Sequence, residues 1–336
     1  LAYGGLSNIW GADIRAYNKE DLSSSHFSYK EYERVYSDLY KLITNVSDQD
    51  HDYERLVQIT ESKKYPHIDS RCKDLINSEI LKKNGIYMEH SNLAILYKDK
   101  NDRKKCNYEG ECLNNPPYVF NAKFEIDELK QNKNFTYIPN TFIQSIKKDK
   151  DKYLIKTTNL KDSKITLFKT DKVFCSLGAL STTKLVLKMI GLIGQEVPLF
   201  STPGASFILF SFKKKRQGST EIAASNANFE INHGNEVITG GLFPFPNDWW
   251  VNKFGRGPIS LAMLYILDKI FFSRVLVCSL NFSSNYSSNF ISLNEEDELE
   301  IRGNRHSESL KSAFKTLLKT LSKAFRLESY YILPLS

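Results

Sequence analysis

The chain has 336 residues, of which 41% are hydrophobic, 12% aromatic and 25% charged, a composition that is ordinary for a packed globular protein and excludes wholesale disorder. The formal net charge of +7 comes from lysines that alternate with Asp and Glu in surface-like runs, so nucleic acid is not an expected partner. The five cysteines include no C-x-x-C pair and the six histidines include no pair at metal-ligand spacing, so we expect no disulfide framework, no metal site and a reducing, cytoplasmic compartment.

The opening residues, LAYGGLSNIWG, are the first informative stretch. Glycines adopt backbone angles that are closed to other residues, and they let a ligand approach the main chain. The stretch therefore indicates a cofactor-contacting turn built from Gly4, Gly5, Ser7 and Asn8, with Trp10 as a flat wall. A tight turn around a buried Trp explains the same residues equally well.

Helical signals follow at Ser28 and Glu31, which have the spacing of a capping box. We expect an amphipathic helix that packs on a core through Tyr32, Val35, Tyr36, Leu39, Ile43 and Val46. The strand-like runs IYMEH and NLAILY come next, followed by a turn-rich segment at 106–121. For Cys106 and Cys112 in that segment, two free thiols are favoured over a bridge or a cluster-ligand role.

A short helix is expected at 122–130, and strands are expected at 135–138, 141–146, 153–158 and 165–169. The following run, VFCSLGALSTTKLVL, predicts an apolar strand at Val173 to Cys175, a glycine turn, and a helix capped by Ser181, Thr182 or Thr183. The N-terminus of such a helix attracts phosphate. Taken alone, the pattern favours an ordinary crossover from strand to helix.

Beyond Gly191, the segments ASFILFSF, GGLFPFPNDWW, RVLVCSLNF, NFISL and ELEIRG alternate as antiparallel strands do. The apolar run at 258–280 contains three charged residues, so we expect a buried helix leading into a buried strand, and no membrane span. A last helix is expected to pack on a sheet through Leu310, Ala313, Phe314, Leu317, Leu321, Ala324 and Phe325.

The segment GGLSNIWGA resembles the flavin-contacting motif of the glucose-methanol-choline family of FAD-dependent oxidoreductases. VFCSLGALSTTKLVL is similar to that family's later strand, A-G-A turn and Leu-rich helix, and CLNNPPYVFNAK and TFIQSI follow in the matching order. The resemblance implies an α/β fold, α+β overall, with two interleaved and incomplete domains. The FAD-binding, Rossmann-like domain is expected at 1–20 and 122–195. A substrate or cap region is expected at 21–121, and the antiparallel sheet and helix of the substrate domain at 196–336.

The resemblance also implies cofactor-binding roles. The residues expected along the isoalloxazine are Gly4, Gly5, Ser7, Asn8, Ile9 and Trp10. Phe142 is expected where the backbone meets the adenine, and Ser176, Gly178 and Ala179 near the diphosphate and ribose. Some members of the family carry, at the position of Ile9, a histidine that is bonded to the flavin. Since isoleucine cannot form that bond, FAD is expected to be held non-covalently.

Two parts of the family's pattern are missing, namely the G-x-G-x-x-G fingerprint before the opening turn and the C-terminal segment with the catalytic histidine. We therefore interpret the chain as an internal fragment that contains no catalytic residue and is itself inactive. The whole protein is expected to oxidise CH–OH groups of an alcohol, with a bacterial sugar as the favoured class. Oxygen, a quinone and a protein remain open as electron acceptors. A non-catalytic binding or scaffolding protein of the same fold is the alternative.

Overall fold

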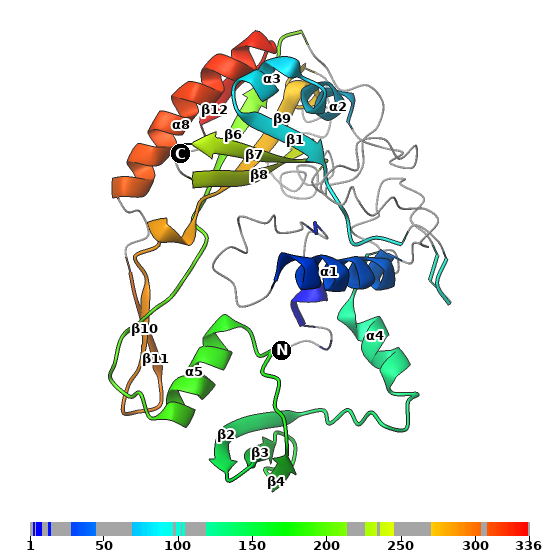
Figure 1. Cartoon of the computed structure of the whole chain (residues 1–336), viewed down its shortest axis with the longest axis vertical. Coiled ribbons are helices and arrows are strands. Elements are labelled where there is room, and N and C mark those ends of the chain that lie inside the picture. The colour runs from blue at the N-terminus through cyan, green and yellow to red at the C-terminus, as the bar shows by residue number, and fades with distance from the viewer. Residues whose placement is uncertain are drawn as a thin grey trace, which may run out of the picture. The chain divides into compact units, whose positions relative to one another are not determined.

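The computed structural model describes residues 3, 5–8, 13–14, 28–44, 69–96, 99–101, 103–104, 119–213, 226–233, 236–244, 270–303 and 308–334. The chain divides into two compact units, each of which is built from separate stretches of sequence (Figure 1). Unit 1 comprises Leu1–Ile126, Pro203–Ser283 and Ser312–Ser336, and unit 2 comprises Asp127–Thr202 and Ser284–Lys311.

Unit 1 contains a six-stranded sheet with the strand order β1-β7-β8-β9-β6-β12, in which every neighbouring pair is antiparallel. Its strands are β1 (Ile86–His90), β6 (Gly204–Phe210), β7 (Ala227–His233), β8 (Glu236–Pro244), β9 (Val275–Asn281) and β12 (Tyr331–Pro334). The antiparallel strands expected from ASFILFSF, GGLFPFPNDWW and RVLVCSLNF are thus confirmed as β6, β8 and β9. The strands β7 and β12 were not predicted from the sequence.

Helix α8 (Glu308–Leu327) lies across this sheet in Figure 1. Its buried side chains are Leu317, Leu321, Ala324 and Phe325, which confirms the predicted packing face. The ring of Phe314 packs edge-on against that of Phe282, with the ring centroids 6.3 Å apart. Two short helices, α2 (Ser70–Ile76) and α3 (Glu79–Lys83), contact β1, and η4 (Phe272–Arg274) leads into β9.

Helix α1 (Tyr29–Thr44) begins with the predicted capping box. The backbone N–H of Glu31 donates to Ser28 Oγ at 3.2 Å, and the backbone N–H of Ser28 donates to Glu31 Oε2 at 3.3 Å. The predicted packing face is only partly right, because Tyr32, Tyr36 and Ile43 are half-buried but Val35 and Leu39 are about half exposed. Tyr40, which was not predicted, is buried. The rings of four tyrosines follow one another along this helix instead: Tyr29, Tyr32, Tyr36 and Tyr40.

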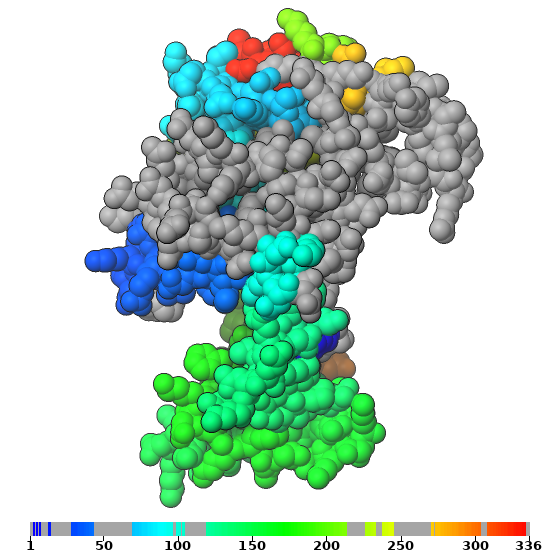
Figure 2. All heavy atoms as spheres, turned by 90° about the vertical axis from the view of Figure 1, so that its right-hand side faces the viewer, coloured from blue at the N-terminus to red at the C-terminus, as the bar shows by residue number. Residues whose placement is uncertain are grey.

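Unit 2 contains a three-stranded antiparallel sheet made of β2 (Thr141–Asp149), β3 (Lys152–Asn159) and β4 (Ile165–Thr170). Helix α5 (Ala179–Ile190) contacts β2, and Figure 2 shows this part of the chain as one continuous surface in green. A second small sheet has the order β11-β10-β5, formed by Leu299–Arg302, Phe290–Leu293 and Val197–Pro198, and the single turn η5 (Ser284–Tyr286) precedes it. In the turn between β10 and β11, Asp297 accepts a hydrogen bond from Lys188 of α5 at 2.8 Å.

Several expectations for the middle of the chain are corrected. Residues 135–138 form no strand, and neither do Val173 to Cys175. Phe174 is 89% exposed, so the apolar run before α5 finds no strand to pair with among the described residues. The helix begins at Ala179, with Gly178 rather than a hydroxyl residue as its N-cap.

All strand pairings between the described residues are antiparallel. The fold therefore combines helices with antiparallel sheets, as expected for an α+β chain, but the Rossmann-like part of the prediction is not confirmed. Within the described ranges, no helix is both long and apolar enough to cross a membrane.

Candidate functional site

The opening turn is a short 3-10 helix, η1 (Gly5–Asn8), and Gly5 takes the left-handed φ of +59° that a glycine turn requires. The hydroxyl of Ser7 accepts a hydrogen bond from the backbone N–H of Ala122 at 2.9 Å and donates to Asn121 Oδ1 at 3.4 Å. Ala122 is the first residue of α4 (Ala122–Leu129). The Ser7 hydroxyl thus satisfies one of the free N–H groups at the start of that helix.

This contact connects the two ends of unit 1's first stretch. Asn121 Oδ1 also accepts from the backbone N–H of Lys123 at 2.9 Å, so Ser7 and Asn121 together cap α4. The predicted flavin contacts Gly4, Ile9 and Trp10 lie outside the described residues, as do Cys106 and Cys112. The opening turn is therefore held by a side-chain contact that sequence reasoning missed, since no local motif links residues so far apart in the chain.

The start of α5 contains the second group of predicted site residues, and all three of them, Ser176, Gly178 and Ala179, are exposed. Gly178 has φ +83° and ψ 161°, and no side chain caps the helix at this end. The hydroxyl of Thr182 bonds backward, accepting from the backbone N–H of Leu177 at 3.2 Å. The end of α5 that has the partial positive charge is thus left open to an anion.

Phe142 lies on β2, the strand that α5 contacts. A bulge between Ile143 and Ser145 reverses the alternation of side chains, so Ile146 is buried while Phe142 is 57% exposed. The register aligns Phe142 with Thr158 of β3 and, beyond it, with Ile165 of β4, which is also exposed. Unit 2 therefore contains Phe142 and the start of α5, and the residues of the opening turn belong to unit 1.

A buried polar cluster in unit 1, which the sequence analysis did not predict, has Asp69 and Arg71 at its centre. Arg71 donates from Nε to Asp69 Oδ1 at 2.8 Å and from Nη2 to Asp69 Oδ2 at 2.6 Å, and both side chains are at most 2% exposed. Arg71 Nη1 also donates to the carbonyls of Ser273 and Val275, at 2.9 and 3.1 Å. Burial lowers the pKa of Arg71, but the hydrogen bonds and charge of Asp69 outweigh burial and leave that pKa raised.

The same cluster extends to the N-terminal stretch through two asparagines of β7 and its entry. The backbone N–H of Asp69 donates to Asn226 Oδ1 at 2.9 Å, and Asn228 Nδ2 donates to Asp13 Oδ1 at 3.2 Å. Ser91 donates to Asn228 Oδ1 at 3.1 Å. These contacts join the start of the chain to the six-stranded sheet. The one local pattern among them is Asp69, which could have been recognised as the N-cap of α2.

The described cysteines are Cys72, Cys175 and Cys278. Cys72 and Cys278 are buried, and burial raises the pKa of both thiols well above the ordinary value, so neither is a ready thiolate. Cys175 is exposed beside the start of α5. The described residues contain no cluster of His, Cys, Asp or Glu that could hold a metal ion.

No protein-family model matches the chain, and no curated protein sequence matches it either. The resemblance to the glucose-methanol-choline family therefore depends on the two motifs and on the order of the elements between them.

Proposed function

We propose that the chain is part of a FAD-dependent oxidoreductase that oxidises a CH–OH group of an alcohol, with sugars as the favoured substrate class. The observation that carries this proposal is the conformation of Gly178 at the start of α5, where the resemblance expects the diphosphate. With φ +83° and ψ 161°, this residue occupies a region of backbone space that is essentially open to glycine alone. Serine, threonine and aspartate, which usually cap a helix, are disfavoured there.

The surroundings of Gly178 fit an approaching anion. A Cβ atom added at this position would meet no other atom within 4 Å, so the backbone faces open space. Ser176 and Ala179 on either side are also exposed. Backbone N–H groups at the N-terminus of a helix bind phosphate groups, and no side chain competes for them at α5.

In this proposal, bound FAD supplies the acceptor for the hydride that leaves the substrate carbon. The chain's own contribution is binding and orientation. In unit 2, Gly178 and Ala179 would hold the diphosphate, and the exposed ring of Phe142 would lie toward the adenine. The family resemblance assigns the flavin contact to the opening turn of unit 1, which Ser7 fixes to α4. The base that takes the hydroxyl proton would be a histidine outside this sequence.

The proposal is tested on the protein expressed from its complete gene. We expect flavin absorption bands, release of FAD into the supernatant when the protein is denatured with acid, and reduction of a dye in the presence of a sugar or another alcohol. Flavin that stays with the denatured chain would contradict non-covalent binding. A colourless protein that does not bind added FAD would contradict the whole proposal and favour the non-catalytic alternative.

A pair of variants tests the placement of the diphosphate. Ser181→Glu adds a carboxylate to the first turn of α5. The helix tolerates a negative charge at this end, but the added carboxylate would repel the diphosphate. Met189→Glu adds the same charge to the last turn of that helix and is the control. We expect FAD affinity to fall at least about tenfold, or 1.4 kcal/mol, in the first variant and to change little in the second. Equal affinity in the two variants would remove the diphosphate from α5.

A further inference from the structure

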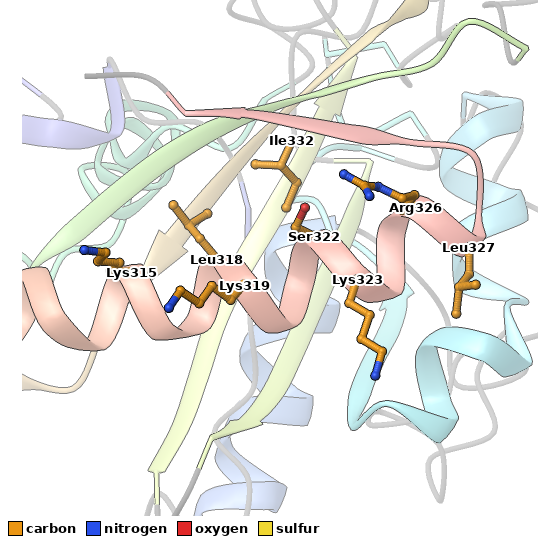
Figure 3. A pocket seen from close by; sticks show the side chains of 8 residues that line it. All are labelled: Lys315, Leu318, Lys319, Ser322, Lys323, Arg326, Leu327 and Ile332. Atoms are coloured by element: carbon orange, nitrogen blue, oxygen red, sulfur yellow. The ribbon is translucent and has the colours of Figure 1, made fainter.

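A groove in unit 1 runs between α8 and the edge strand β12. Its volume is about 640 Å³, and its lining residues are Lys315, Leu318, Lys319, Ser322, Lys323, Arg326, Leu327 and Ile332. Figure 3 shows Leu318, Ser322 and Arg326 on the side of α8 that faces β12, with Ile332 pointing back toward the helix. The groove therefore combines an apolar floor with a basic wall.

The basic wall is not neutralised within the described part of the chain. Lys315, Lys319 and Lys323 are spaced four residues apart, so they form one stripe along α8. The described acidic residues form no ion pair with this stripe or with Arg326, and Glu308 at the start of the helix pairs with Lys311 instead. Arg326 lies over the ring of Tyr331, 5.9 Å from its centroid. The groove thus presents four cations and no acidic side chain to an occupant.

The other wall of the groove is a sheet edge. Strand β12 stands last in the strand order and pairs only with β6 among the described strands. Its residues Tyr331, Ile332 and Leu333 are uncharged, and Pro334, which has no backbone N–H, ends the strand. Tyr331 and Leu333 are both more than two-fifths exposed. Within the part of the chain that the structure describes, no strand pairs with the outer side of Tyr331 to Leu333.

The dimensions of the groove fit a short extended peptide. At 1.5 Å per helical residue, the lining from Lys315 to Leu327 is about 18 Å long. An extended chain covers that length with about five or six residues at 3.3 Å each. A planar membrane surface would contact the lysines without pairing with the edge of β12.

We propose that this groove binds an acidic peptide segment of a partner protein in extended conformation, as an added strand on β12. Backbone hydrogen bonds to β12 would provide affinity. The acidic side chains of this strand would point toward α8 and pair with Lys319 and Lys323, and the apolar side chains between them would lie on the opposite face of the sheet. This interaction is independent of the proposed flavin chemistry.

The test uses the full chain and a fluorescein-labelled Glu-Val-Glu-Val-Glu-Val hexapeptide, with binding followed by fluorescence anisotropy. We expect saturable binding that weakens at least about tenfold in the double variant Lys319→Glu, Lys323→Glu, since both contacts become repulsive. The control is Lys161→Glu, Lys164→Glu, which makes the same change in net charge in the exposed β3–β4 turn and is expected to bind within about twofold of the parent. Melting curves of the two double variants check that both are folded.

Two peptide controls separate strand addition from simple charge attraction. A hexapeptide of glutamate alone, and a Glu-Val peptide N-methylated at alternate backbone nitrogens in either register, should each bind at least about tenfold more weakly. Equal binding of either control, or no binding of the parent peptide, would overturn the proposal. Binding to phosphatidylserine vesicles that depends on Lys319 and Lys323, in the absence of peptide binding, would identify a membrane as the occupant and would overturn it as well.

Discussion

The buried ion pair of Asp69 and Arg71 gives the sharpest test of how unit 1 is held together. Replacing Arg71 with methionine fills a similar volume but removes four hydrogen bonds, two to Asp69 and two to the carbonyls of Ser273 and Val275. The carboxylate of Asp69, which is 0% exposed, would then have no cationic partner among these contacts. Breaking one side of a buried pair costs about 3–5 kcal/mol. Calorimetry should show a melting temperature lowered by about 6–20 °C at pH 7, at about 2–4 °C per kcal/mol.

Two further variants separate pairing from general damage. In the double variant Asp69→Asn, Arg71→Met neither charge remains, so its loss should be smaller than the sum of the two single losses by about 1–3 kcal/mol. Glu79→Gln removes the exposed pair with Lys82 and should change stability by less than about 1 kcal/mol. A single-variant loss below about 1 kcal/mol, or strict additivity in the double variant, would refute the reasoning.

Three smaller predictions concern other parts of the fold. Gly240→Ala should disrupt the pairing of β8 with β9 and lower the yield of folded protein in a solubility assay, because the added Cβ would clash with the carbonyl oxygen of Ser279. Hydrogen bonds from the lysines of α5 lower the pKa of Asp297. The ionised carboxylate therefore stabilises the fold above the ordinary aspartate pKa, and this stabilisation is lost as the pH falls through the lowered pKa. Asp297→Asn should reduce the loss of unfolding free energy at acid pH, measured as melting temperature against pH. Ser28→Ala removes the cap of α1 and should cost about 1 kcal/mol in thermal unfolding, whereas an unchanged melting temperature would show that α1 does not depend on this cap.

The sequence predicted best where a local pattern and the final burial agree. The strands β6, β8 and β9 were recognisable because their apolar runs are bounded by turn residues, and α8 because one face repeats at helical spacing. The capping box of α1 was recognisable because both partners lie within one turn. In each case the information needed is contained in a few neighbouring residues.

The failures arise where burial depends on distant contacts. Val173 to Cys175 have the composition of a strand, but no described strand pairs with them, and Phe174 is exposed. The cluster around Arg71 joins α2 to residues about two hundred positions away in the chain, at Ser273 and Val275, so no spacing rule indicates it. The residues of the candidate site show the same difference between local and distant information. Gly178 was found from a local motif, whereas the contact between Ser7 and α4 was not.

The conformation of Gly178 links the sequence motif to the proposed chemistry. Helices usually begin with Ser, Thr, Asp or Asn, whose side chains occupy the first backbone N–H groups. A residue at φ +83° and ψ 161° is restricted to glycine, so the turn before α5 excludes the side chains that would compete with a ligand. The hydroxyl of Thr182, in the first turns of α5, accepts a hydrogen bond from the backbone N–H of Leu177, which precedes the helix. The backbone N–H groups at the start of α5 are therefore not used by a capping side chain, which is what the proposed contact with the diphosphate requires.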